Sequence, residues 1–344
     1  MAARGRLEGE GAVRAVAEKA KKPGVIDTLS AGFDTINRRL WIVLLPMAVD
    51  LLLWRGPHIT PQPLFQRLIA WQQAALSPGE TIAPSGQRVD EVLQTLEAAL
   101  AGFNMLSLLV LNFVANVPNT TVGRPADTSF VITVSNETAF VLLFVLIELV
   151  GLALGCFYLG LIAQQVRDGK VSLRRLGAKL GSYCGHALAL ALMVLAAAAA
   201  LLVPLTVLLV ASVLLGGAAA QVTAGVVATA LYFAALWALL FLYFAVDAIV
   251  VSEVGARRAI LNSVLVVGKN FWPALGLIFL TILILTGTQI IWTSISYSSW
   301  GVMAGVVGNA YIASGLAAAS MLFYSSRMAG LEENGYYKRI LRRQ

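Results

Sequence analysis

Long apolar stretches alternate with short basic segments along most of the chain. No Lys, Arg, Asp or Glu occurs in residues 180–246 or in residues 270–326. A helix that crosses a bilayer needs about 20 apolar residues. Each of the two stretches is therefore long enough for two membrane-spanning helices and the turn between them.

The apolar pattern as a whole predicts about six membrane-spanning helices. They occupy residues 40–54, 139–163, 187–215, 218–246, 272–295 and 302–324. Residues 55–137 form a long excursion with an apolar stretch at 102–116, which we expect to lie on the outer interface. Residues 1–24 are rich in charge, alanine and glycine, which is typical of a disordered tail. The predicted fold is all-α and polytopic, with residues 25–344 as a single membrane domain.

Three amphipathic segments precede the first, third and fifth predicted spans. Their apolar residues recur with helical spacing, so we expect helices that lie in the headgroup layer. In the third segment Arg257, Arg258 and Asn262 fall off the apolar face. The three apolar faces consist of Val25, Ile26, Leu29, Phe33, Ile36 and Leu40, then Leu173, Leu176, Leu180 and Tyr183, and finally Ile260, Val264, Val267 and Phe271.

The predicted second, fourth and sixth spans end in a similar way. Each carries an apolar residue followed by Tyr, and a Gly follows that Tyr after 11, 12 and 11 positions. The pairs are Tyr158 with Gly169, Tyr243 with Gly255, and Tyr324 with Gly335. This pattern predicts three repeated units, each an interfacial helix plus a two-span hairpin. The alternative is that any hairpin protein with basic cytoplasmic loops resembles this pattern by chance.

Composition and charge fix the class and the orientation. Only 12% of the residues are charged, against about 25% in soluble domains, so much of the surface must face lipid. All but four of the 25 Lys and Arg lie before the first span, after the second and fourth, or after the sixth. The positive-inside rule places these segments and both termini in the cytoplasm. We therefore expect a multi-pass protein of the cytoplasmic membrane.

The basic segments also define the expected partners. A basic excess on one side of a bilayer is explained by orientation and by contact with anionic lipids, so we do not expect nucleic-acid binding. A membrane-protein partner or a homo-oligomer is compatible with this composition. The candidate lipid-headgroup contacts are Arg38, Arg39, Arg174, Arg175, Lys179, Arg257 and Arg258.

Two segments carry a resemblance to known proteins. They are residues 259–273, AILNSVLVVGKNFWP, and residues 31–41, AGFDTINRRLW. They resemble uncharacterised bacterial six-span proteins and the membrane domain attached to some glycerophosphodiester phosphodiesterases. The resemblance implies interfacial elbow helices around a six-helix bundle, and it implies no activity. The phosphodiesterase domain opens with a His-Arg-Gly motif, whereas His58 and His186 are followed by other residues, so we expect that domain to be absent.

Residues with catalytic or metal-binding potential are few. The chain has two His and two Cys, and no Walker, zincin, CxxC or nucleophile-elbow motif. We expect no catalytic site, no metal and no cofactor.

Two acids, Asp50 and Glu148, lie within the predicted spans. Glu148 lies near the middle of the second span, where a charged carboxylate costs at least about 2.5 kcal/mol. We therefore expect a protonated Glu148 that faces the bundle and hydrogen-bonds to Asn309 or Gln289. Two interpretations follow: a structural hydrogen bond between spans, or a protonation or ligand site.

The sequence predicts a function only by class. A non-enzymatic scaffold, assembly or accessory factor of the cytoplasmic membrane fits the lack of catalytic motifs. The alternative is a transporter or carrier for a small solute, lipid or proton that uses Glu148.

Overall fold

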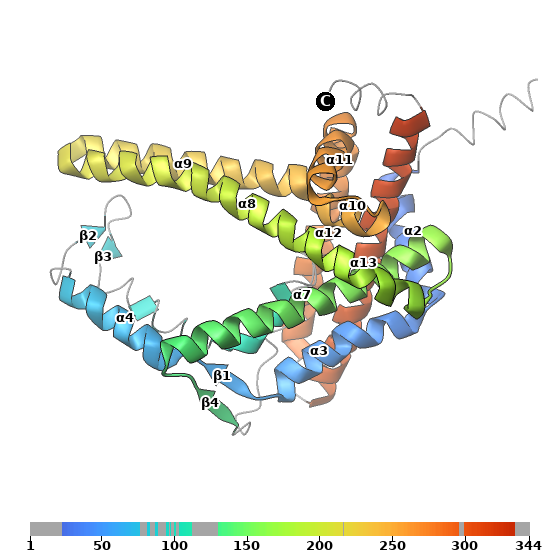
Figure 1. The fold of residues 1–344 in the computed structure, drawn as a ribbon, viewed down its shortest axis with the longest axis horizontal. Coiled ribbons are helices and arrows are strands. Elements are labelled where there is room, and N and C mark those ends of the chain that lie inside the picture. Colours follow the sequence, from blue (N-terminus) through green and yellow to red (C-terminus); the bar gives the residue numbers. More distant parts are fainter. Residues whose placement is uncertain are drawn as a thin grey trace, which may run out of the picture.

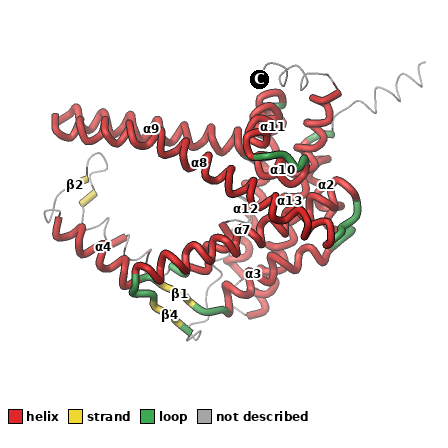
Figure 2. The backbone as a smooth tube through the Cα atoms, in the orientation of Figure 1, coloured by secondary structure: helices red, strands yellow, loops and turns green. Residues whose placement is uncertain are grey.

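The computed structural model describes residues 23–75, 81–82, 87–88, 94–95, 97, 100, 103–111, 130–215, 217–295 and 299–333. Most of the predicted tail, the turn after the fifth span and the last eleven residues lie outside these ranges. Helices make up nearly all of the described chain (Figure 2). The all-α class is thus confirmed.

Within the described part of the chain, five helices are long and apolar enough to cross a membrane. They begin with α7 and end with α13 (Figure 1). The candidate spans are Glu137–Asp168, Leu173–Ser212, Ala220–Val251, Phe271–Ile295 and Trp300–Glu332. The protein is therefore membrane-embedded.

The described chain contains the helices and strands given below, and the candidate spans are the longest of them. The helices are α2 (Val25–Asn37), η1 (Leu40–Val43), α3 (Leu44–Arg55), α4 (Gln62–Ala75), η2 (Met105–Ser107), α6 (Leu108–Leu111), α7 (Glu137–Asp168), α8 (Leu173–Leu215), α9 (Gly217–Leu242), α10 (Ala245–Val251), α11 (Ala256–Lys269), α12 (Phe271–Ile295) and α13 (Ser299–Glu333). The strands are β1 (His58–Thr60), β2 (Thr81–Ile82), β3 (Gln87–Arg88) and β4 (Val131–Thr133), paired as β1 with β4 in parallel and β2 with β3 antiparallel.

Helix α13 is the centre of the bundle. Of its most apolar window 72% is buried, more than in any other candidate span. Many of its buried residues are small, as at Ala310, Ala318 and Ala319, so neighbouring helices approach closely. Helices α2, α7, α10 and α12 all contact it.

The N-terminal helix α2 runs antiparallel to the C-terminal half of α13. Arg327 donates to the carbonyl of Pro23 at one end, and Tyr311 donates to Asn37 at the other. Near the middle Gly32 lies against Ala319, where a Cβ would lie only 2.6 Å from the Ala319 nitrogen. The partner of α2 is thus a protein helix along much of its length, not the headgroup layer alone.

The predicted first span is not among the five long helices. Residues 40–55 form the four-residue η1 and the twelve-residue α3, which together fall short of the about 20 residues that a straight span needs. Trp54 near the end of α3 packs with Val302 and Val306 at the start of α13. The segment therefore packs along α13 as two short helices that follow one another directly.

The second amphipathic segment is not a separate elbow. Residues 173–183 are helical, as predicted, but they continue without a break into α8, which has 43 residues. At about 1.5 Å per residue α8 is about twice as long as a ~30 Å bilayer core. Leu176 and Tyr183 of the predicted face are buried, whereas Leu173 is exposed.

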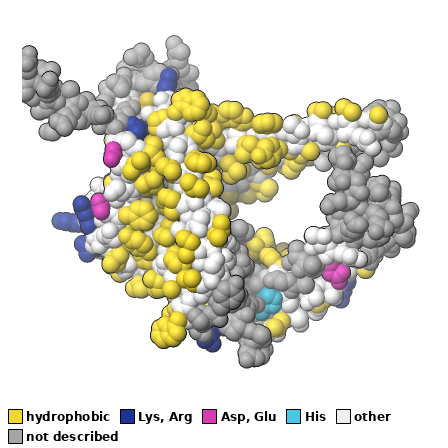
Figure 3. All heavy atoms as spheres, turned by 180° about the vertical axis from the view of Figure 1, so that it is seen from behind, with side chains coloured by type: hydrophobic (Ala, Val, Ile, Leu, Met, Phe, Trp, Pro, Cys, Tyr) yellow, Lys and Arg dark blue, Asp and Glu magenta, His cyan; other side chains and the backbone are white. Residues whose placement is uncertain are grey.

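Helices α8 and α9 form a hairpin that leaves the bundle. The most apolar window of α8 has no buried residue. Figure 3 shows an open space between this hairpin and the part of the molecule that carries α7. The outer half of the hairpin therefore presents apolar side chains with little packing from the described chain.

The fourth predicted span is interrupted, against our expectation of a continuous helix. α9 ends at Leu242 and α10 begins at Ala245, with a turn at Tyr243 and Phe244. The third amphipathic face was also predicted wrongly, since Asn262 and Ser263 are buried while Val264 is partly exposed. The reason is that Ser263 bonds to the backbone at the break beside α11, and Asn262 bonds to Tyr324 of α13.

The described part of the excursion packs on the start of α7. Residues 103–111 form η2 and α6 rather than one long interfacial helix, and the remainder of 102–116 lies outside the described residues. Met105 and Leu109 share a small core with Ile59 and Ile147. The buried Asn104 accepts a hydrogen bond from the Ile59 N–H at 3.0 Å and so fixes β1.

Candidate functional site

The short helix α10 lies at the C-terminal end of the interrupted fourth span. Six of its seven residues are buried. A break precedes it, and residue 253 after it has a left-handed backbone. Polar side chains from α11, α13, α7 and α8 hold this helix at its beginning, its middle and its end.

Ser263 of α11 forms hydrogen bonds with the backbone groups at the break before α10. Its hydroxyl donates to the Phe241 carbonyl at 2.6 Å and accepts from the Phe244 N–H at 3.1 Å. A broken helix in a membrane needs such partners, because lipid offers none to the freed backbone groups. The Ser263 side chain therefore supplies a hydrogen-bond partner to both backbone groups at the break.

Asp247 lies within the first turn of α10 and is only 4% exposed. The Ser320 hydroxyl of α13 donates to its Oδ2. Among the described residues we find no ion pair to Asp247. Ionisable side chains at such positions are rare and are usually functional. Asp247 and Ser320 are thus the principal buried polar pair of the bundle.

The end of α10 is tied to Tyr324 of α13. The Tyr324 hydroxyl is 2.9 Å from the Ser252 hydroxyl, and it accepts from Asn262 at 3.2 Å. Next to it the rings of Phe244 and Phe323 stack with their centroids 5.3 Å apart. These contacts join α10, α11 and α13 around one buried polar core.

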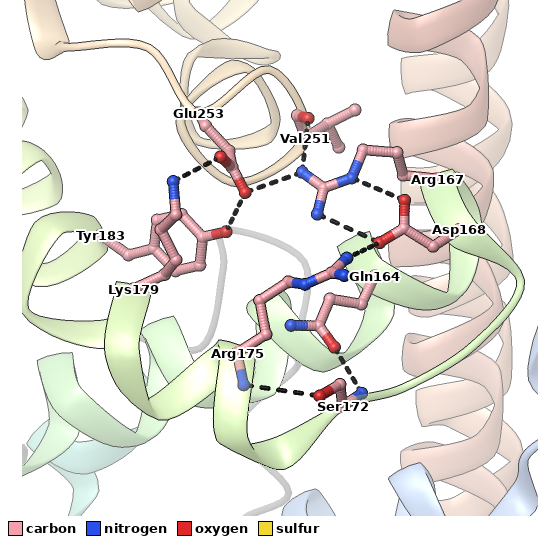
Figure 4. Close-up of polar contacts among 9 residues, drawn as sticks. All are labelled: Gln164, Arg167, Asp168, Ser172, Arg175, Lys179, Tyr183, Val251 and Glu253. Carbon is pink, nitrogen blue, oxygen red and sulfur yellow. Dashed lines mark hydrogen bonds and ion pairs between the residues drawn. The ribbon is translucent and has the colours of Figure 1, made fainter.

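Glu253 is the centre of a polar cluster that joins the end of α7, the start of α8 and the turn after α10 (Figure 4). Its carboxylate lies 2.8 Å from Nζ of Lys179 and 2.9 Å from Nη1 of Arg167, and the Tyr183 hydroxyl donates to it at 3.1 Å. The Lys179 ammonium, followed by Arg167 and Tyr183, lowers the pKa of Glu253 to about 2. The carboxylate therefore stays ionised throughout the physiological range.

The same cluster continues from Arg167 to the start of α8. Arg167 also pairs with Asp168, and Asp168 pairs with Arg175 at 3.0 Å. Gln164 accepts from the Ser172 N–H at 2.8 Å, which fixes the turn from α7 to α8. The turn begins at Gly169, whose φ of 63° is readily adopted by glycine. Two interhelical connections thus meet at one network.

The structure does not form the predicted hydrogen bond between Glu148 and Asn309. Glu148 is half-buried, and Gln289 is also half-buried. Asn309 is 1% exposed, but neither of its amide atoms has a hydrogen-bond partner in the structure. Asp50 is buried close to Tyr158, which bonds to Ser314 of α13. The four predicted residues therefore do not form one site.

The predicted lipid-headgroup residues are all exposed, as far as their side chains are described. Arg175 forms an ion pair with Asp168, and Lys179 forms an ion pair with Glu253. Arg257 and Arg258 instead border a groove on α8. Their contact with lipid stays a prediction.

Sequence reasoning missed Asp247 and the role of Glu253. Asp247 comes one residue after the predicted fourth span, so the hydropathy pattern leaves it outside the membrane-spanning helices. Asn262 was predicted to lie off the apolar face of the interfacial helix, and Ser263 had no predicted role. The sequence does contain a signal for this site. Asp247 is an acid directly after an apolar span, and the polar residues Asn262 and Ser263 follow within 20 residues on a predicted helix.

No family model, curated protein or solved structure matches this chain. The site must therefore be interpreted from its own geometry.

Proposed function

We propose that this chain is a multi-pass protein of the bacterial cytoplasmic membrane that scaffolds or assembles other membrane components. The concentration of Lys and Arg before the first span, between spans and after the last supports cytoplasmic termini. The packing of Trp54 against the start of α13 supports a sixth crossing formed by η1 and α3. The three-unit repeat remains part of this proposal.

The observation that carries the scaffold is the α8–α9 hairpin. A helix inside a bundle buries one face, yet the apolar window of α8 buries none. Leu195 is 65% and Leu239 65% exposed, on the two arms of the hairpin. Its occupant in this proposal is a transmembrane helix of another membrane protein, which would lie in the open space beside the hairpin.

A row of glycines on α8 agrees with this role. Gly177, Gly181 and Gly185 are spaced by four residues and are exposed, and a Cβ at any of them would meet no atom within 4 Å. Such a spacing permits close approach of a second helix. By contrast, Gly308 in α13 is already covered by Trp292.

Photo-crosslinking in the native membrane tests the scaffold. A photoreactive residue replaces Val207 or Leu239 on the hairpin, and Phe279 on α12 is the control, since its exposure of 61% is similar to 64% at Val207. The scaffold predicts one discrete protein adduct from both hairpin positions and none from the control. An adduct of doubled mass would identify a second copy. Lipid adducts alone at all positions would contradict the proposal.

A carrier is the second candidate, and the buried pair at the break favours it. Discontinuous helices with an intramembrane acid are typical of transporter binding sites. In this alternative Asp247, rather than Glu148, holds the proton or solute. In proteoliposomes with an internal pH dye, wild type would pass protons under an imposed gradient, Asp247→Asn would not, and Glu148→Gln would. No flux above empty liposomes would eliminate the carrier.

A further inference from the structure

A groove lies between α8 and the beginning of α11, outside the contacts described above. Its volume is about 550 Å³, and it is open to the surface. Ala189 and Met193 of α8 line one part, and Gly255, Ala256, Arg257 and Arg258 line the other. The groove is therefore apolar on one side and basic on the other.

The basic side has charge that the protein does not neutralise. Both arginines are exposed, and among the described residues neither has an ion pair. The nearby acid Glu253 is already paired with Arg167 and Lys179. Two positive charges thus remain for a ligand.

His186 adds a polar group at the edge of the groove. Its Nε2 lies 3.7 Å from the position that a Cβ would take at Gly255. Its other ring nitrogen lies 3.4 Å from the Ser182 hydroxyl, which orients the imidazole. No side chain caps the first turn of α11 at Gly255, so its N–H groups also face this region.

The apolar side continues along α8 into the membrane. Leu188, Leu192 and Leu195 are exposed on the turns that include Ala189 and Met193. A ligand that fits must therefore have an anionic head and a long apolar tail. A soluble anion would leave the apolar side uncovered, and a zwitterionic lipid would place its own cation beside the arginines.

We propose that the groove binds one anionic phospholipid, with its phosphate at Arg257 and Arg258 and an acyl chain along Ala189 and Met193. His186 borders the headgroup. The site is distinct from the proposed carrier, because Asp247 does not contribute to it, and it overlaps the hairpin surface of the proposed scaffold only at Leu195. It assigns a specific bound lipid to two of the basic residues, rather than a general attraction to the membrane surface.

Native mass spectrometry of the full-length protein in detergent tests this site. The probes are long-chain phosphatidylglycerol, phosphatidylcholine of the same chain length, and glycerol phosphate. Wild type should retain one phosphatidylglycerol and bind phosphatidylcholine much more weakly. The double variant Arg257→Gln with Arg258→Gln should bind phosphatidylglycerol about 30-fold more weakly, since each basic residue near an anionic headgroup contributes about 1 kcal/mol.

The matched control is Arg38→Gln with Arg39→Gln. This pair is also adjacent and exposed, so it removes the same charge from another place. It should leave the affinity for the single lipid within about twofold. Met193→Gln should weaken the binding of the long-chain lipid and leave the binding of glycerol phosphate unchanged, because only the lipid tail contacts that residue.

Three results would overturn the proposal. Equal losses of phosphatidylglycerol affinity in the two double-arginine variants would show that the effect depends on net charge and not on this groove. Equal affinity for phosphatidylcholine and phosphatidylglycerol would show that the site does not distinguish lipid headgroups. Displacement of the lipid by an equal concentration of glycerol phosphate would identify a site for a soluble anion.

Discussion

The guanidinium of Arg167 and the carboxylate of Glu253 lie 2.9 Å apart, although 86 residues separate them in the chain. Arg167 lies next to the end of α7, and Glu253 lies in the turn between α10 and α11. Glu253 has a φ of 53°, which is uncommon for a residue with a side chain. The ion pairs with Arg167 and Lys179 hold this backbone conformation, which costs about 1–2 kcal/mol for a non-glycine residue.

Glu253→Gln should lower the stability of the purified protein. The amide keeps the shape but loses both ion pairs, so Lys179 loses its carboxylate partner and Arg167 keeps only Asp168. We expect a loss of about 1–2 kcal/mol, because the pairs are partly exposed and each hydrogen bond to a charged group is worth about that much. The midpoint of thermal unfolding in detergent measures it. Glu332→Gln, at an exposed position without these partners, is the control.

The left-handed backbone at Glu253 gives a separate prediction. Glu253→Gly and Glu253→Ala both remove the carboxylate, but only glycine adopts a positive φ without strain. The glycine variant should therefore unfold at a higher temperature than the alanine variant. An alanine variant that is at least as stable would show that the turn relaxes when the ion pairs are removed.

The effect of Glu253 should depend on pH in a defined window. Its pKa in the fold is about 2, against an ordinary value of 4.5. The lowered pKa means that the ionised form stabilises the fold fully above pH 4.5 and loses this contribution as the pH falls toward 2. The difference in unfolding midpoint between wild type and Glu253→Gln should be constant from pH 5 to 7 and shrink below 4.5. A constant difference down to pH 3 would contradict it.

Ser263→Ala should destabilise the region around α10. The variant leaves the Phe244 N–H without its partner and removes the donor to the Phe241 carbonyl. Each unsatisfied buried group costs about 1–3 kcal/mol. Hydrogen exchange at residues 241–251 should rise in this variant. Ser325→Ala is the control, since that hydroxyl only donates to a carbonyl of its own helix, at Leu322.

Hydropathy and charge were enough to place five of the predicted spans. The second, third and fifth spans match α7, α8 and α12 closely, because a lipid-facing helix is apolar over its whole length. The end of α7 was also readable, since Gly169 is a typical left-handed helix terminus. The predicted first span was harder to assess, because two short helices occupy its residues.

The polar core could not be predicted from local patterns. Ser263 bonds to groups 19 and 22 residues away, and Ser320 bonds to Asp247 across 73 residues. Hydropathy assigns such residues to loops or wet faces, because it does not record the partner that satisfies them. Glu148 illustrates a related limit: its position along the span follows from sequence length, but that position does not specify which neighbour it meets.

The close contact of α2 with α13 gives the last prediction. A Cβ on Gly32 would lie 2.6 Å from the Cβ and backbone nitrogen of Ala319, and a Cβ on Gly315 would enter the Phe33 ring. Gly32→Ala must push α2 away from α13, and overpacking of this kind costs about 1–3 kcal/mol. The same change at Gly181, where a Cβ meets nothing within 4 Å, should be neutral or stabilise the helix by up to about 1 kcal/mol. Unfolding midpoints of both variants in one detergent give the comparison. If Gly32→Ala is as stable as Gly181→Ala, α2 does not pack against α13 in the folded protein.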